Sequence, residues 1–182
     1  MSRTDARIRY TQGVLKQALL SFLQEKPINK ITVKEVCERA ELNRATFYAH
    51  YSDCFALLES IEEDLLEAFQ QSLKLVASFD VTALIEAIYT MIEQHQEACR
   101  VLIFQNVCPN VLRRMISLAR GKSIAYWKQH LHRVTEAELE MLYTHLSNGL
   151  MHVVVEGYEK YSREEVVRFV NRIVQCSLSQ FQ

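Results

Sequence analysis

The sequence predicts an all-α protein, because the chain contains few residues that make turns and its apolar residues recur at helical spacing. Only four glycines and two prolines occur among 182 residues. A β-sandwich or barrel needs a turn about every 8–12 residues, which so few turn residues cannot supply. Apolar residues make up 49% of the chain and charged residues 24%, as in folded globular proteins. The length corresponds to one domain, or to a small module joined to a larger one in the same chain.

The first part of the chain predicts three helices. A helix over residues 5–25 carries apolar residues three and four positions apart and is stopped by Pro27. Thr32 and Glu35 form a capping box, which opens a short second helix. Asn43 is a favourable N-cap for a third short helix. The two short helices are too small to bury a core alone, so they must pack on the first helix.

We expect two domains, a three-helix head over residues 1–52 and a helical body over residues 53–182. A long helix opened by Asp53 would join them without a flexible linker. The head contains nine Lys and Arg against five Asp and Glu, whereas the body contains 12 against 17. A basic head on an acidic body indicates that the head meets a polyanion.

The body predicts four further long helices. Two are expected over residues 80–104 and 111–131, with a break at Pro109 between them. Capping boxes that begin at Thr135 and Ser162 open the last two helices.

Apolar residues on two sides of the last two helices predict a homodimer. One side must pack inside the subunit, and a symmetric partner is the simplest cover for the other. A single thick monomeric bundle is the alternative, and the pattern leaves open which face forms the interface. The candidate interface residues are Met151, Val154, Val155, Tyr158, Val170, Ile173 and Val174.

One continuous stretch of the head carries a specific motif. Ile31–Asp53 combines a capping threonine, a short helix, an Ala-x-Leu turn, a polar N-cap and the run Thr-Phe-Tyr-x-His-Tyr. This combination closely resembles the helix-turn-helix signature of TetR-family transcriptional regulators. The resemblance implies a DNA-binding transcriptional regulator. Together with the hairpin pattern and the scattered cysteines, we expect a cytoplasmic homodimer, whose two-fold axis would make the operator an inverted repeat.

The third helix of the head would then be the recognition helix. Such a helix is held by few buried residues, here Phe47 and Tyr51, and offers the others to a DNA groove. Arg44 can bond guanine through both arms of its guanidinium, and the small Ala45 or Thr46 can approach a thymine methyl group.

Phosphate contacts would position this helix rather than read the sequence. The resemblance implies such contacts for Thr32, Tyr48 and His50, with Lys34 nearby. The alternative is that Tyr48 and His50 merely decorate the surface of a helix bundle. The complete candidate DNA-binding set is Thr32, Lys34, Asn43, Arg44, Ala45, Thr46, Tyr48 and His50.

Two positions depart from the family pattern. Glu41 stands in the turn where the family often has glycine, at a residue that would need a positive φ, and glutamate there would cost about 1 kcal/mol. Cys54 stands where the family commonly has a lysine that faces phosphate at a helix N-terminus. The second departure removes one expected backbone contact.

The resemblance further implies a repressor released by a small-molecule effector of unknown identity. A DNA-binding coregulator, including an activator, whose body docks a protein partner is the alternative; a helical bundle that binds a small molecule without any role on DNA is a third. The sequence leaves open the operator, the regulated genes and the sign of regulation. Residues that could line an effector pocket are Tyr89, His95, Phe104, Met115, Tyr126 and Trp127.

Other classes of protein are not indicated. There is no Gly-rich phosphate loop, GxSxG elbow or HExxH motif, so we expect neither an enzyme nor a cofactor. His145 and His152 lie two helical turns apart, too far to bind one metal together, and no metal site is expected. Five scattered cysteines indicate reduced thiols, and there is neither a secretory signal nor an apolar run long enough to cross a membrane.

Overall fold

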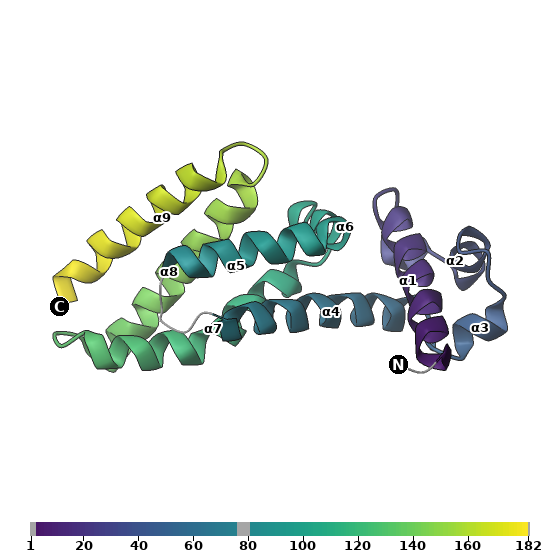
Figure 1. Ribbon diagram of the computed structural model, residues 1–182, viewed down its shortest axis with the longest axis horizontal. Coiled ribbons are helices and arrows are strands. Elements are labelled where there is room, and N and C mark those ends of the chain that lie inside the picture. The colour runs from purple at the N-terminus through teal and green to yellow at the C-terminus, as the bar shows by residue number, and fades with distance from the viewer. Residues whose placement is uncertain (1–2, 76–80, 182) are drawn as a thin grey trace. The chain divides into compact units, whose positions relative to one another are not determined.

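The computed structural model describes residues 3–75 and 81–181, and in these ranges every regular element is a helix (Figure 1). The all-α prediction is therefore confirmed. The α-helices are α1 (Arg3–Leu23), α2 (Val33–Arg39), α3 (Arg44–Tyr48), α4 (Cys54–Leu75), α5 (Val81–Gln94), α6 (Gln96–Cys99), α7 (Pro109–His130), α8 (Glu136–Gly157) and α9 (Arg163–Leu178).

The chain forms two compact units. The first unit extends to Leu65 and also includes Glu97–Val107; the second comprises Leu66–Gln96 and the chain from Cys108 onward. Helix α4 contributes to both. The domain boundary expected after Ser52 stays a prediction.

The first unit has a core built from the apolar stripe of α1. Leu15 and Leu19 are fully buried, as are Val36 of α2 and Phe47 of α3. Helix α1 packs on α2, and α2 packs on α3. The two short helices therefore share a core with α1, which α2 contacts directly, while α3 packs on α2.

The turn between α2 and α3 depends on a left-handed residue. Glu41 has φ = 54°, as expected from its place in the motif. The amide of Leu42 donates to the carbonyl of Cys37 at 2.9 Å, which closes the end of α2. A side chain at this φ is strained, because its Cβ crowds the backbone.

Replacing Glu41 with glycine is expected to raise the free energy of unfolding by about 1 kcal/mol, because glycine adopts this φ without the steric penalty. Urea denaturation at neutral pH measures the change. The matched control is Glu41→Ala, which removes the same charged group but keeps the Cβ and should bring no such gain. Equal stabilisation by both substitutions would contradict the explanation.

The stretch predicted as one helix over residues 80–104 is interrupted. Helix α5 is followed by the short α6 and then by a π-helical turn over Arg100–Phe104. Cys99 and the run Val101–Ile103 are buried. The amide of Gln105 donates to the carbonyl of Arg100 at 2.9 Å, five residues earlier, which is the spacing of a π-helical turn.

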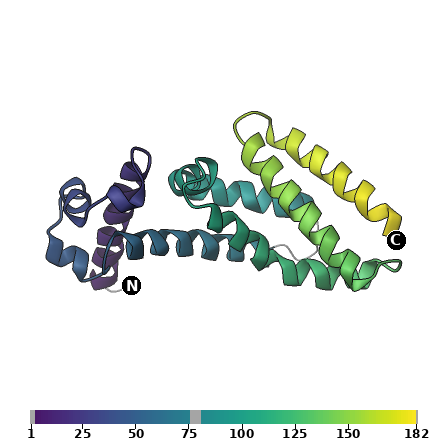
Figure 2. The ribbon, with the colours of Figure 1, turned by 180° about the vertical axis from the view of Figure 1, so that it is seen from behind.

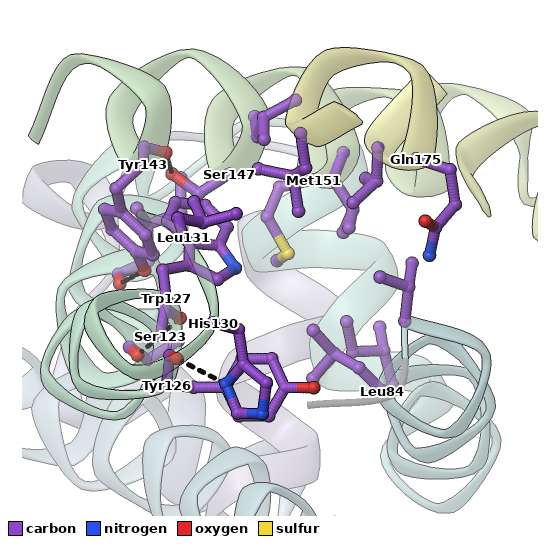
Figure 3. Close-up of a pocket in the computed structure, with 18 of the residues that line it drawn as sticks. Leu84, Ser123, Tyr126, Trp127, His130, Leu131, Tyr143, Ser147, Met151 and Gln175 are labelled. Atoms are coloured by element: carbon purple, nitrogen blue, oxygen red, sulfur yellow. Dashed lines mark hydrogen bonds between the residues drawn. The ribbon is translucent and has the colours of Figure 1, made fainter. Parts of the chain in front are cut away.

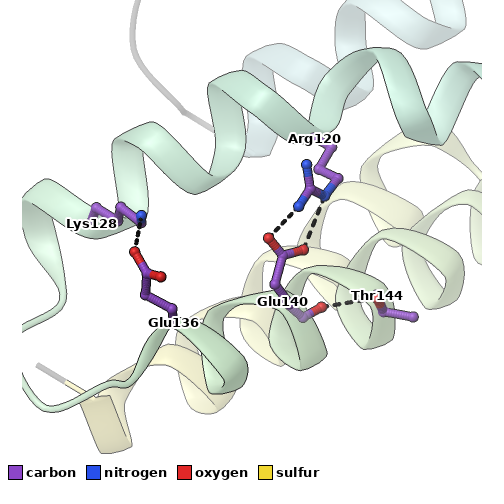
Figure 4. A network of polar contacts seen from close by, with 5 residues as sticks. All are labelled: Arg120, Lys128, Glu136, Glu140 and Thr144. Carbon is purple, nitrogen blue, oxygen red and sulfur yellow. Dashed lines mark hydrogen bonds and ion pairs between the residues drawn. The ribbon is translucent and has the colours of Figure 1, made fainter.

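The second unit is a bundle in which α7 packs on α8, α5 on α9, and α8 on α9. Helices α8 and α9 form a hairpin that is visible from both sides (Figures 1 and 2). The predicted capping boxes at Thr135 and Ser162 open these two helices. Between α7 and α8, Arg120 contacts Glu140 and Lys128 contacts Glu136, the latter pair at 2.6 Å (Figure 4). Because these ion pairs are exposed, they contribute little to the free energy of unfolding, and their main effect is on the register of the two helices.

The capping box of α2 is expected to make the first unit sensitive to acid. Hydrogen bonds from Lys26 and Thr32 lower the pKa of Glu35 from 4.5 to about 2. Because the pKa in the folded state lies below that of the unfolded chain, the stabilisation is complete above pH 4.5 and is lost as the pH falls toward about 2. Glu35→Gln should therefore destabilise the protein at neutral pH, and the difference from the unsubstituted chain should shrink in acid.

Urea midpoints of both chains across this pH range measure the effect. Glu38→Gln is the control, since Glu38 is an exposed carboxylate of the same helix outside the capping box. A loss of stability in Glu35→Gln that is the same at every pH would refute the ionic role of this carboxylate.

Candidate functional site

Helix α3 is held in place at both ends of its five residues. The Asn43 side chain accepts hydrogen bonds from the Thr46 amide at 2.7 Å and from the Thr46 hydroxyl at 2.9 Å. Phe47 is fully buried, and Tyr51 is buried just beyond the helix. A helix this short is not stable alone, so the cap and the aromatic anchor determine its orientation.

The remaining residues of α3 form an outward face. Arg44, Ala45 and Tyr48 are exposed and Thr46 is half-buried, as is His50 just beyond the helix. The Tyr48 side chain is 57% exposed, although its ring lies edge-on to that of Phe47 with centroids 5.6 Å apart. The structure thus places a guanidinium, a methyl group and an oriented phenol on one short helix.

The side chains at the start of α2 are engaged in contacts within their own helix. The Thr32 hydroxyl donates to the Glu35 carboxylate at 2.7 Å and accepts from the Glu35 amide at 3.3 Å. Lys34 is exposed, with its ammonium 3.7 Å from the Glu38 carboxylate. A phosphate at Thr32 would have to compete with the capping box, whereas Lys34 can turn its ammonium to an anion without breaking the helix start.

Cys54 is buried in the first unit and does not face solvent. Its side chain is 4% exposed, and burial raises the pKa of the thiol to about 11. The start of α4 is capped instead by Asp53, whose carboxylate accepts from the Ala56 amide at 2.8 Å. The family's lysine contact is therefore absent at this position.

Several basic residues that make the head positive are used inside the first unit. Lys16 pairs with Asp64 at 2.5 Å, and Lys26 pairs with Glu35 at 2.6 Å. The Arg39 guanidinium lies 4.1 Å from the centroid of an aromatic ring of α1. Charge counting missed these internal pairs, because sequence position alone does not show which cations face solvent.

The second unit contains a cavity of about 200 Å³ between its helices (Figure 3). Phe69 of α4, three residues of α5 and parts of α7, α8 and α9 surround it. Its lining residues are Phe69, Val81, Leu84, Ile88, Ile116, Ala119, Ser123, Tyr126, Trp127, His130, Leu131, Tyr143, Leu146, Ser147, Leu150, Met151, Val174, Gln175 and Leu178.

The lining differs from the set expected from sequence. Tyr126 and Trp127 line the cavity, but the other four candidates do not. Tyr89 and Met115 are buried elsewhere, and the Tyr89 ring lies near the ring of Tyr158, the residue that follows α8. His95 lies between α5 and α6, and Phe104 belongs to the first unit. Aromatic residues at helical spacing can face either the core or a cavity, and periodicity does not separate the two.

Residues that the sequence analysis missed include the hydroxyl groups of the cavity wall. Tyr143 donates a hydrogen bond to the carbonyl of Ile116, and burial raises its pKa to about 12. Ser123 and Ser147 bond to carbonyls of their own helices at 2.9 and 2.6 Å. Spacing offered a signal, since Ser123 and Trp127, and Tyr143 and Ser147, are each four residues apart and share a helix face.

The candidate dimer residues do not share one face. Met151, Val154, Val170 and Val174 are buried inside the subunit, with exposed fractions no greater than 6%. Two further candidates, Val155 and Tyr158, are half-buried, while Ile173 is 42% exposed. The four buried residues therefore form the inner face of the hairpin. The sequence pattern is apolar on both sides of these helices, so it could not distinguish the inner face from the outer one.

The outer face of the hairpin has a groove of about 240 Å³ between α8 and α9. Phe169 and Ile173, one turn apart on α9, are both exposed and line it. Gly149 of α8 lies in its floor, with nothing within 4 Å of where a Cβ would stand. We refer to these residues together with Val153 as the α8–α9 face.

The described residues contain neither a metal-binding cluster nor a membrane-spanning helix. No group of three His, Cys, Asp or Glu side chains in residues 3–75 and 81–181 could hold a metal ion. None of the helices in these same ranges is long and apolar enough to span a membrane. The cysteines Cys37, Cys54, Cys99, Cys108 and Cys176 are not in disulfides.

The sequence of the chain matches a known protein only in part. No family model matches the chain. Over 62 residues the chain is 37% identical to a protein of Bacillus subtilis (strain 168) named "Uncharacterized HTH-type transcriptional regulator YxbF"; the match covers 34% of this chain and only 16% of that protein's length.

Solved structures match over nearly the whole chain. The TetR transcriptional regulator from Streptococcus agalactiae 2603V superposes with a TM-score of 0.68 at 23% identity, covering 94% of this chain and 97% of that one. The dihydroxyacetone kinase operon activator DhaS superposes with a TM-score of 0.64 at 16% identity, covering 94% and 98%. The chain is therefore TetR-like: it has the fold of TetR transcriptional regulators and carries a helix-turn-helix, α2 and α3, in its first unit.

Proposed function

We propose that this chain is a sequence-specific DNA-binding transcriptional regulator, a cytoplasmic homodimer that represses until a small molecule releases it from an inverted-repeat operator. Residues 1–52 form the DNA-binding domain, and residues 53–182 bind the effector and the second copy. The observation that carries the proposal is the outward face of α3, where Arg44, Ala45 and Tyr48 are exposed on a helix fixed by its cap and by Phe47. A helix presented in this way matches what a major groove admits.

The residues of this face divide into two roles. Arg44, the first residue of α3, reads a guanine through its N7 and O6 atoms. Thr46 has its hydroxyl bonded to Asn43, which leaves the methyl group for a thymine. Tyr48 and Lys34 contact phosphates and set the position of the helix, and His50 assists from its half-buried site.

Dimerisation uses the α8–α9 face. Exposed apolar residues at successive turns of α9 beside a glycine of α8 allow close approach of an identical hairpin about a two-fold axis. Two recognition helices related in this way read half-sites about 34 Å apart, one turn of DNA. The operator is therefore an inverted repeat.

The cavity is the effector site. Phe69, which lies on α4, is part of its wall, and α4 is the helix that follows the head in the chain. A ligand that binds one arrangement of α4 more tightly changes operator affinity by that difference, typically about 1–3 kcal/mol.

A coregulator that docks a protein partner through its body is the second candidate. It is supported by the name of one structural relative, the operon activator DhaS. The cavity of about 200 Å³ also lies below the usual size of small-molecule sites, about 300–1,000 Å³.

Selection of bound sites from random duplex DNA by the purified chain tests the proposal. Enrichment of an inverted repeat supports it, and Arg44→Ala should alter the enriched sequence. No enrichment over random DNA at fixed salt would refute sequence-specific binding. Transcription from the selected operator, reconstituted with RNA polymerase, then separates the two candidates. A fall in transcript without other proteins indicates a repressor, whereas stimulation indicates a coregulator whose protein partner is the polymerase.

A further inference from the structure

The wall of the cavity in the second unit contains no acidic side chain and neither lysine nor arginine among its 19 lining residues. An ionised ligand would lose its hydration there without gaining a counter-charge, which is strongly unfavourable. The cavity chemistry therefore selects an uncharged molecule.

The shape and composition of the wall favour an aromatic ring. Trp127 and Tyr143 lie on one side with ring centroids 6.1 Å apart, and Met151 lies on another (Figure 3). Aromatic rings attract further rings in offset or edge-on contact, and thioether sulfur also packs well on rings. A cavity of about 150 Å³ lined by aliphatic and aromatic residues is enough for benzene, so about 200 Å³ holds one or two rings.

His130, an exposed residue at the edge of the cavity, offers it a hydrogen-bond acceptor. The Nδ1 atom of His130 lies 2.8 Å from the carbonyl oxygen of Tyr126, and the two rings are stacked with centroids 4.0 Å apart. Because a carbonyl only accepts, Nδ1 must hold the proton, and in the neutral ring Nε2 is left as an acceptor. The two stacked rings lie together on one side of the cavity (Figure 3).

We propose that the cavity binds an uncharged aromatic molecule of one or two rings that donates a hydrogen bond, as a phenol does, to Nε2 of His130. The inference rests on the proposed effector role of this cavity and specifies the chemical class of the effector. A planar ring contacts Trp127 and Met151, and its hydroxyl or ring N–H group points to His130.

Three probes of nearly equal size test this class: 4-ethylphenol, its methyl ether 4-ethylanisole, and 4-ethylbenzoate. Titration of the full chain by calorimetry gives each Kd, and Trp127, the only tryptophan in the sequence, reports binding in the cavity by its fluorescence. We expect the phenol to bind about two- to tenfold more tightly than the ether, which lacks the donor. The benzoate should bind more than about tenfold more weakly than the phenol.

Variants locate the site. His130→Phe keeps a ring for stacking on Tyr126 and should abolish the preference for phenol over ether, whereas the control His132→Phe, outside the cavity lining, should preserve it. Ala119→Phe fills the cavity and should weaken all three probes together. Circular dichroism identifies any variant that fails to fold, and the preference measured on the unsubstituted chain decides the proposal in that case.

Tighter binding of the benzoate, or a preference for phenol that survives His130→Phe, would overturn this assignment. Operator binding is measured on the same protein without any probe. If the chain binds its operator but none of the probes, the ligand class is refuted and the proposed DNA function stands. If it binds the phenol but no DNA, the DNA function is refuted and the ligand class stands.

Discussion

Replacement of Phe169 or Ile173 with glutamate is expected to convert the protein to monomers and to weaken operator binding at least about 100-fold. Both side chains are exposed and line the α8–α9 face. In the proposed dimer each charge would be buried in an apolar interface without a counter-charge, which is strongly unfavourable. A monomer engages one half-site at a time and loses the gain from two linked contacts, which is about 10²- to 10⁴-fold.

Sedimentation equilibrium measures the first effect and fluorescence anisotropy with an operator duplex measures the second. Leu118→Glu is the matched control: Leu118 is 41% exposed on α7, away from the α8–α9 face, and its substitution should leave the dimer intact. Circular dichroism verifies that each variant remains helical. Dimers that persist in both Phe169→Glu and Ile173→Glu would exclude this face as the interface.

Substitutions of Arg44 and Tyr48 are expected to have effects of different kinds. Arg44→Ala should cost about 1–3 kcal/mol per half-site and relax the preference at one base pair, because in the proposed complex the guanidinium reads a base edge. Tyr48→Phe removes one hydroxyl and should weaken all sequences by a common factor while their order stays the same. The phenol of Tyr48 is well placed for this comparison, since its ring stays against Phe47 when the hydroxyl is removed.

Titration of each variant against an operator and its single-base variants at one salt concentration separates the two effects. Lys30→Ala provides a control outside the candidate DNA-binding set. If Arg44→Ala weakened every sequence equally, or Tyr48→Phe changed their order, α3 would dock in a different orientation from the one proposed.

Local signals explain how much of the fold could be predicted. The capping boxes at Thr32, Thr135 and Ser162 each open the helix expected of them, because a cap is a contact between residues three apart. The left-handed turn at Glu41 was likewise predicted from its motif and confirmed by φ = 54°. The π-helical turn at Arg100–Phe104 was missed, since the apolar spacing of this stretch continues through it without a cap, a glycine or a proline.

The candidate sites were less predictable, because they depend on which helix face meets which neighbour. Val154 and Ile173 both belong to apolar stripes, yet one is fully buried and the other 42% exposed. Tyr126 and Tyr89 are both aromatic residues of the body, yet only the former lines the cavity. Periodicity identifies an apolar face, and only the packed structure assigns that face to a core, a cavity or a partner.

The way α3 is fixed has a consequence for the speed of DNA recognition. The five residues of this helix owe their order to the Asn43 cap and to the buried Phe47, both present before any contact with DNA. The proposed DNA-reading surface is thus pre-formed, and no segment of it has to fold during the encounter. Association can then proceed at a rate governed by diffusion, orientation and the attraction between Arg44 or Lys34 and the phosphate backbone, so discrimination between operators would be expressed in the lifetime of the complex.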